Sequence, residues 1–318
     1  MPQARGTQLA VNLYEETAYG EDPGTPDGQK AYVKSIGQGA TQNLIESETL
    51  TGSRTKSKPV QGNVDVGYDV PMEMAPESIG TWLKHALGQV ATSGTDPYTH
   101  VISIGDLPVG LLVERDYGSN ISGSGRFMRH NGIRVASASF SFPQEGFPEV
   151  TFSLKGAKET LSDSALDATP TDNGHEPWNG FQASIEEGGS VIATVTALEF
   201  SLNNNLDESA YVIGDKERQD LAEGQAVVEG QLTAMFDSAT LLNKAINYTE
   251  SSLKVTLSRG DGLGSAGNES LEFSLPNLVY ERQSPGVEGP QGILVTLPFK
   301  CYGNTTLQAT LKNALATI

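Results

Sequence analysis

The sequence predicts an all-β protein with minor helix, built as two tandem antiparallel β-sandwich or barrel domains, each with one flanking α-helix. A strand–turn–helix unit occurs twice, first between Pro59 and Gly88 and again between Ala226 and Tyr248. Repetition on this scale indicates a duplicated domain. The length of 318 residues also fits about two domains. The 35 Gly and 16 Pro, with few long helical patterns, favour strands joined by turns.

The first residues of the chain predict little regular structure. Residues 1–35 read as a polar arm rich in Gly, Pro and Asp that ends in a short strand around residues 31–36. Residues 38–58 form either an interaction loop or a long hairpin, because functionless loops of this length are uncommon in compact domains. The second half of this stretch is basic and contains Arg54, Lys56 and Lys58.

The first copy of the repeated unit follows this basic stretch. A strand at residues 62–70 alternates apolar and polar residues, which is typical of a strand with one face on a core. A helix is expected at residues 76–87, where Ile79, Leu83 and Leu87 recur at helical spacing and Gly88 marks the end. Further strands are expected near residues 99–104, 109–115, 132–142 and 149–154.

The second half repeats this plan after a linker. Residues 161–177 are rich in Ser, Thr, Asp and Pro, so we expect domains at residues 1–160 and 178–318. The tail, residues 304–318, reads as a short helix or an extended arm. Between them, strands are expected near residues 181–185, 190–202, 225–237, 253–258, 269–281 and 291–302, with a helix at residues 239–248.

Polar residues share one face of the repeated strand in both copies. In the first copy, Asn63, Asp65 and Asp69 lie opposite a face of valines and a tyrosine. In the second copy, Glu229 and Gln231 lie opposite Val228, Leu232, Ala234 and Phe236. Alternation alone favours an ordinary solvated outer face for these polar residues.

Composition and charge exclude several functions. The formal net charge of −18 argues against binding nucleic acid through its phosphates, which requires concentrated Lys and Arg. Cys301 is the single cysteine, so no disulfide framework or thiolate metal site is expected. The chain shows no apolar run like that of a signal peptide or a membrane span, so a soluble protein made in a reducing compartment is expected.

Catalytic, cofactor and metal motifs are not expected in this chain. Residues 262–267 fit G-x-G-x-x-G, but a strand-like run follows them where a dinucleotide site needs a helix. Residues 259–261 spell RGD in the same loop, which we interpret as chance. The four histidines are scattered without metal-ligand spacing, and no G-x-S-x-G turn is present. We therefore predict no enzyme, no cofactor and no metal.

Several phrases along the chain resemble the major tail tube proteins of siphophages. The opening residues 6–23, GTQLAVNLYEETAYGEDP, resemble the start of these proteins. Residues 44–72, LIESETLTGSRTKSKPVQGNVDVGYDVPM, resemble their next block, and residues 98–116 resemble a later one. Residues 224–238, GQAVVEGQLTAMFDS, are similar to a G-x-x-V-x-G-x-(L/F)-T-x-x-F stretch of the family. The phrases occur in the family's order over almost the whole chain.

The resemblance implies a structural protein of the virion, without catalytic residues. In this family, two packed antiparallel sheets with a flanking helix form one domain, and six domains usually form a ring whose inner sheets join around a DNA channel. Two domains in one chain imply a trimeric, pseudo-hexameric ring, whereas six chains would form the ring if the second half is not such a domain. The implied partners are further copies of the chain and the terminator, tape-measure and distal tail proteins, with DNA passing through the lumen and no membrane contact. The implied location is the virion tail tube, after synthesis in the host bacterial cytoplasm.

Functional residues follow from this resemblance as hypotheses. The lumen-facing candidates are Asn63, Asp65, Asp69, Glu229 and Gln231, whose acids would repel DNA phosphates. The ring-stacking candidates are Arg54, Lys56 and Lys58, together with the N-terminal arm and the C-terminal tail.

Two other interpretations remain open at this stage. A soluble lectin-like or adhesin-like binding module would need exposed aromatic residues, of which Trp178 is the one suggestive case, although a core position is the more common role. A terminator or another tail subunit would form a single ring and stop.

Overall fold

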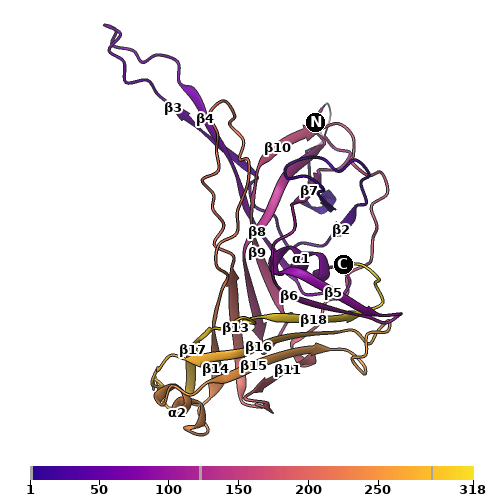
Figure 1. Ribbon diagram of the computed structural model, residues 1–318, viewed down its shortest axis with the longest axis vertical. Helices are drawn as coiled ribbons and strands as arrows, with labels where there is room; N and C mark the ends of the chain where they lie inside the picture. The colour runs from indigo at the N-terminus through magenta and orange to yellow at the C-terminus, as the bar shows by residue number, and fades with distance from the viewer. Residues whose placement is uncertain (1–2, 122–123, 288) are drawn as a thin grey trace.

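The computed structural model describes residues 3–121, 124–287 and 289–318. These residues form an antiparallel β protein with 18 strands and two short α-helices. This confirms the prediction of an all-β protein with minor helix. The strands form two extended layers that cross steeply, with a smaller third sheet beside them (Figure 1).

One extended layer, here called the first layer, runs through both halves of the chain. Each of its strands pairs antiparallel with the next. In spatial order the layer contains β3 (Ala40–Ile45), β4 (Val60–Glu73), β9 (Glu149–Gly156), the second part of β8 (Phe127–Pro143), β13 (Val195–Asn203), β14 (Val227–Met235) and β17 (Leu294–Cys301).

The second layer also draws on both halves and packs across the first. Its long strand β16 starts between β15 and β18 and ends beside β17, so it connects the two layers. In spatial order this layer contains β5 (Gly88–Gly94), β6 (Tyr98–Ile104), β18 (Gln308–Asn313), β16 (Ser270–Tyr280), β15 (Ser251–Ser258), β11 (Ala183–Glu187) and β12 (Ser190–Val191).

The two halves of the chain are therefore joined by backbone pairing in both layers. In the first layer, residues 137–143 of β8 pair with residues 197–203 of β13. In the second layer, β18 from the end of the chain pairs along its length with β6. Alternation of apolar and polar residues predicts individual strands but not which distant strands pair, so these two pairings between the halves were not predicted from the sequence.

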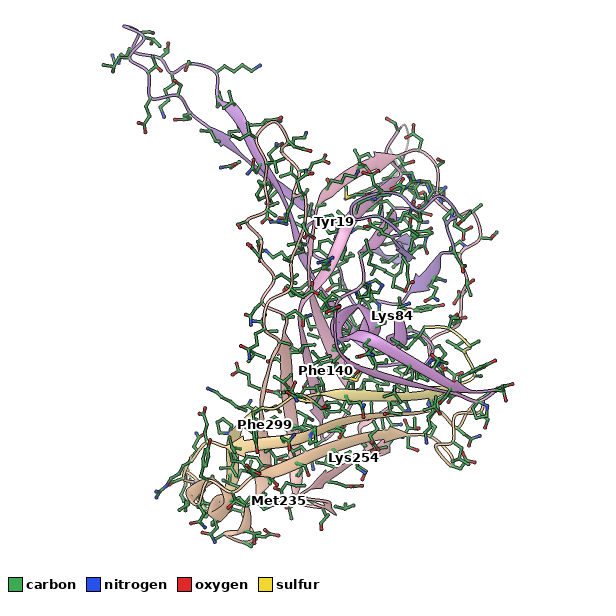
Figure 2. The ribbon with its side chains drawn as sticks, viewed as in Figure 1. Tyr19, Lys84, Phe140, Met235, Lys254 and Phe299 are labelled. Carbon is green, nitrogen blue, oxygen red and sulfur yellow. The ribbon has the colours of Figure 1, made fainter. Side chains whose placement is uncertain are left out.

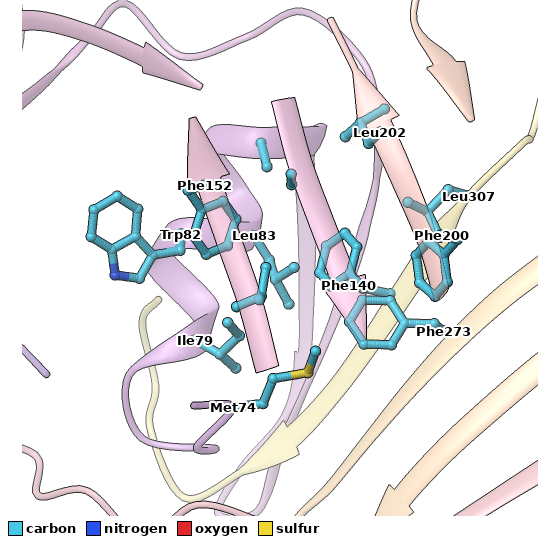
Figure 3. Packing of buried hydrophobic residues seen from close by; sticks show 14 of the residues in the cluster. Met74, Ile79, Trp82, Leu83, Phe140, Phe152, Phe200, Leu202, Phe273 and Leu307 are labelled. Atoms are coloured by element: carbon cyan, nitrogen blue, oxygen red, sulfur yellow. The ribbon is translucent and has the colours of Figure 1, made fainter. Parts of the chain in front are cut away.

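A single aromatic cluster fills the space where the layers cross. Phe140 of β8 stacks on Phe200 of β13 with ring centroids 4.8 Å apart, and its ring lies 4.9 Å from Phe273 of β16 (Figure 3). Phe152 of β9 stacks on Trp82 of the first helix at 5.2 Å. All five side chains are at most 2% exposed. The core therefore combines residues from both halves of the chain.

Both predicted helices are present, and they differ in burial. Helix α1 (Ile79–Leu87) buries almost its whole length against the core and ends at Gly88, whose φ of 104° favours glycine. Helix α2 (Thr240–Ile246) is shorter and buries only Ala245. The connection before each helix has nearly the same length, residues 74–78 and 236–239.

The N-terminal segment contains a strand that the sequence analysis missed. In the third sheet, β1 (Ala10–Glu15) pairs with β2 (Gln29–Ala31) on one side and β7 (Leu111–Asp116) on the other. β7 continues to the first part of β8 and to β10 (Lys158–Ser162). Val11, Leu13 and Tyr14 are at most 3% exposed. The expected free arm is therefore partly a folded strand, and the short strand expected at residues 31–36 lies at residues 29–31.

The C-terminal tail and the linker also pack on the body. The tail contains β18, with Leu311 fully buried, so it is neither a helix nor a free arm. In the linker, Asp172 forms an ion pair with Lys30, and the backbone of Thr171 bonds that of Lys30. The predicted division into two domains remains an interpretation of the repeat, because the halves share both layers.

Residues 40–66 form a long hairpin whose outer part projects from the body, here called the arm (Figure 1). The arm consists of β3, the connecting residues 46–59 and the first part of β4. Of the two structures expected for this stretch, the long hairpin is therefore the one adopted. Leu50 at its tip is 98% exposed, and Leu44 and Ile45 are more than half exposed.

Candidate functional site

The most extensive candidate site is the polar face of the first layer. In β4, Val66, Val70 and Met72 are fully buried, while Asp69 between them is exposed. In β14, Val228, Leu232 and Ala234 are about 1% exposed, while Glu229 and Gln231 are exposed. The predicted alternation is therefore present in both strands, and the polar residues face away from the core.

Cross-strand register assembles these polar residues into rows across the layer. One row crosses from the first half of the chain to the second and contains Glu73, Glu149, Ser141, Glu199, Gln231 and Pro298. In the next row, Ser139 of β8 lies opposite Ser201 of β13, which in turn lies opposite Glu229. The face is thus a continuous polar surface with carboxylates on strands from both halves.

This face is hollowed along its middle. The hollow is lined mainly by outward-facing residues of β8, β9, β13, β14 and β17, among them Ser139, Glu149, Glu199 and Glu229. The floor is formed partly by Phe140 and Phe299, which lie near the crossing of the layers (Figure 2).

Among the described residues, this face carries carboxylates that no basic side chain neutralises, because its lysines already form ion pairs with other acids. Lys155 forms an ion pair with Glu208 at 2.8 Å, and Lys300 lies 3.3 Å from Glu281. Glu199 accepts a hydrogen bond from the side-chain amide of Gln231 at 2.8 Å, so its negative charge remains uncompensated. The face therefore keeps a net negative charge.

Asp65 has a different environment from the other candidates. Its carboxylate accepts a 2.7 Å hydrogen bond from the guanidinium of Arg218, whose side chain is 2% exposed. The same guanidinium donates to the backbone carbonyl of Gly156 and lies 5.1 Å from the centre of the Tyr211 ring. This ion pair attaches the connection between β13 and β14 to β4. Asp65 therefore has a structural role in addition to its place on the polar face.

Several carboxylates of the face were missed in the sequence, and Glu149 and Glu199 are the two near its middle. Glu149 and Glu199 lie on β9 and β13, and Glu149 forms an ion pair with Lys34 at 2.5 Å. Each alternates with buried residues along its strand, as in Leu198–Glu199–Phe200. Alternation therefore marks both residues as outward-facing on their own strands, but only the strand register places them on the same face as Glu229.

The basic candidates Arg54, Lys56 and Lys58 lie together on the connecting residues of the arm. All three side chains are exposed. Lys56 pairs with Glu46 on the other side of the hairpin, whereas no ion pair of Arg54 or Lys58 occurs among the described residues. The structure thus places these residues on one projecting tip, far from the polar face (Figure 1).

Other residues considered in the sequence have ordinary structural roles. Residues 262–267 lie in the loop between β15 and β16, without the helix that a dinucleotide site requires. Arg259 of the RGD sequence forms ion pairs with Glu176 and Glu269 and lies over Trp178, which is fully buried. Trp178 is therefore a core residue and no exposed aromatic platform. Among the described residues, no group of three or more His, Cys, Asp and Glu side chains is arranged to hold a metal ion.

One buried carboxyl has a strongly shifted pKa. Burial raises the pKa of Glu16 to about 7, although the backbone N–H groups of Gly132 and Gly20 donate hydrogen bonds to its two oxygens. The side chain connects the residue after β1 to the backbone of β8 at Gly132 in the third sheet. It lies away from the polar face, so we assign it to folding and not to the candidate site.

Comparison with known proteins identifies the class to which this fold and face belong. A family model described as phage tail tube protein matches residues 6–301. The match covers most of the chain, so the protein belongs to the phage tail tube family, as the sequence resemblance indicated. No curated protein sequence matched the chain. The protein is thus a structural tail tube protein, and the family places it in the virion. No described helix has the length and hydropathy needed to cross a membrane.

Proposed function

We propose that this chain is the major tail tube subunit of a long-tailed phage and that three copies form a pseudo-hexameric ring. The supporting observation is the continuous first layer. In this layer the strands of the first half (β3, β4, β9 and β8) are joined side by side, within one chain, to the similar strands of the second half (β13, β14 and β17). Three such layers placed edge to edge would close a barrel of six strand sets. Closure would also pair the exposed sheet edges, which otherwise promote uncontrolled association.

In this ring the polar face lines the channel. The residues proposed to face the lumen are Asn63, Asp65, Asp69, Glu229 and Gln231, together with Glu149 and Glu199. The carboxylates of this face and the phosphates of DNA carry like charges and repel each other. The described residues of this face also offer no concentrated basic surface on which phosphates could bind. DNA would slide through this channel during ejection without specific contacts.

The arm is proposed to connect successive rings. Its tip carries Arg54, Lys56 and Lys58, and an acidic rim on the next ring is the complementary surface for these charges. Exposed Leu44, Ile45 and Leu50 on the same arm would be covered by that contact. The terminator, tape-measure and distal tail proteins are the further proposed partners. The protein would be made in the host bacterial cytoplasm and have no enzymatic role.

Negative-stain electron microscopy over a concentration series tests this function. The expected result is hollow tubes or stacked rings with a central pore. Single rings that do not stack at any concentration would favour a terminator, and monomers throughout would oppose the tube subunit. A lectin-like module receives no support from the structure, because Trp178 is buried.

A further inference from the structure

One strand pairing inside the first layer provides a template for the junction between the first layers of two copies. Within the chain, β8 and β13 join the two halves as an antiparallel strand pair. At one end of the layer lies β3, preceded by residues 33–39, which run beside β4. At the other end lies β17, preceded by residues 281–287, which leave β16. Among the described residues, no strand pairs with the outer edge of β3 or of residues 281–287.

The repeat relates these two ends to the internal junction. Because the connections before α1 and α2 are nearly equal in length, superposing the two units places Asp69 of β4 over Gln231 of β14. Asp69 lies between Ser153 of β9 and the backbone of Gly37. Gln231 correspondingly lies between Pro298 of β17 and Glu199 of β13. Residues 33–45 are therefore the counterpart of β13.

The same superposition makes residues 281–287 the counterpart of the second part of β8. Ser137 of β8 lies opposite Ser153 of β9. In the second copy, the backbone N–H of Glu281 donates to the carbonyl of Pro298, which corresponds to Ser153. Glu281 thus occupies the position of Ser137. In the first copy the segment is a paired strand, whereas residues 281–287 form no strand.

The partner of Ser137 identifies the partner of Glu281. Ser137 pairs with Asn203 of β13, which lies opposite Val227 of β14. Val227 corresponds to Asp65, and Asp65 lies opposite Thr41 of β3. Thr41 is therefore the counterpart of Asn203. Both Thr41 and Glu281 are exposed, and both lie on the polar-face side of the layer.

Exposed apolar side chains lie near one end of the layer. Val287 is 70% exposed, Leu294 is 48% exposed and Met235 is 51% exposed. At the opposite end, Ile36 is only half-buried against the core. Met235 and Leu294 lie on the polar-face side by their register, as does Val287 by alternation from Glu281, so strand pairing alone does not move them into the core.

We propose that residues 281–287 of one copy form a strand that pairs antiparallel with residues 35–41 of the next copy, with Glu281 opposite Thr41. This junction repeats between chains the β8–β13 pairing within each chain, and residues 281–287 become a regular strand only on assembly. The inference rests on the proposed ring and specifies which edges close it.

Cysteine cross-linking in assembled protein tests this register. The two variants are Thr41→Cys and Glu281→Cys, each in a Cys301→Ala background, and they are mixed before assembly and then oxidised. The Cβ atoms of cross-strand neighbours lie about 4.5–5.5 Å apart. A small movement of the two strands brings them to the roughly 3.5–4.5 Å that a disulfide requires. The expected product is a disulfide-linked dimer of the two variants. The double variant should give a ladder that ends at the number of chains in the ring.

The matched control replaces Glu281→Cys by Ser190→Cys, an exposed position on β12 in the second layer. This control should give no dimer under the same oxidation. Rings or tubes that assemble without the Thr41–Glu281 cross-link would overturn the proposed junction while leaving the tube function intact. The absence of any ring or tube from the unmodified protein would instead overturn the proposed function itself.

A proline variant tests the same edge without a cross-link. The N–H of Glu281 points to β17, so the N–H of the next residue, Arg282, points outward towards the neighbouring copy. Arg282→Pro removes this donor, whereas Arg282→Ala keeps it. We expect Arg282→Pro to raise the protein concentration needed for assembly about fivefold or more. Equal assembly of the two variants would contradict the pairing.

Discussion

Phe140 is the residue whose truncation best tests the shared core of the two halves. It is 2% exposed and its ring contacts Phe200 and Phe273, both from the second half of the chain. Phe140→Ala removes the buried ring and leaves a cavity between the two crossed layers. The layers cannot close this cavity, because strand pairing fixes their positions. We expect the free energy of unfolding to fall by about 4 kcal/mol.

Urea denaturation followed by circular dichroism measures this loss. The unmodified protein should unfold in one cooperative transition, because both layers cross the boundary between the halves, and Phe140→Ala should shift that whole transition. Phe181→Ala, at a position 85% exposed, is the control and should change the unfolding free energy by less than about 0.5 kcal/mol. Two separate transitions, of which Phe140→Ala shifts only one, would refute the shared core.

Further predictions concern charge and pH. Glu199→Gln combined with Glu229→Gln should leave tube assembly intact but slow DNA ejection from phage carrying the variant, and an unchanged ejection rate would count against the acidic lumen. Asp65→Asn should lower the unfolding free energy by about 2 kcal/mol in chemical denaturation, because it leaves buried Arg218 without its paired carboxylate. The raised pKa of Glu16 means that the native state binds more protons than the unfolded chain between about pH 4.5 and 7. The contribution of Glu16 to stability should therefore fall as pH rises through that window, by up to about 3 kcal/mol, and thermal melts of Glu16→Gln should lack this slope.

Local patterns were sufficient to predict most strands and both helices. The alternation in β4 and β14 predicted correctly which residues face the core, because one buried face imposes a period of two on a strand. The spacing of Ile79, Leu83 and Leu87 predicted α1 for a similar reason. The order of elements in both halves followed from the same patterns and from the repeat.

The missed features depend on partners that are distant in sequence. β1 and β18 are short, and their burial comes from pairing with β7 and β6, which no local period reveals. The pairing of Asp65 with Arg218 joins residues 153 positions apart, so Asp65 and Asp69 looked equivalent in the sequence. Glu149 and Glu199 became part of the polar face only when the register of five strands was known.

A cryo-electron microscopy reconstruction of the assembled protein is the most direct test of the account. It should show a ring of three chains whose first layers join into one barrel, with Glu199 and Glu229 facing the central channel. A ring in which these carboxylates face outwards, or a protein that remains monomeric at every concentration, would contradict the account.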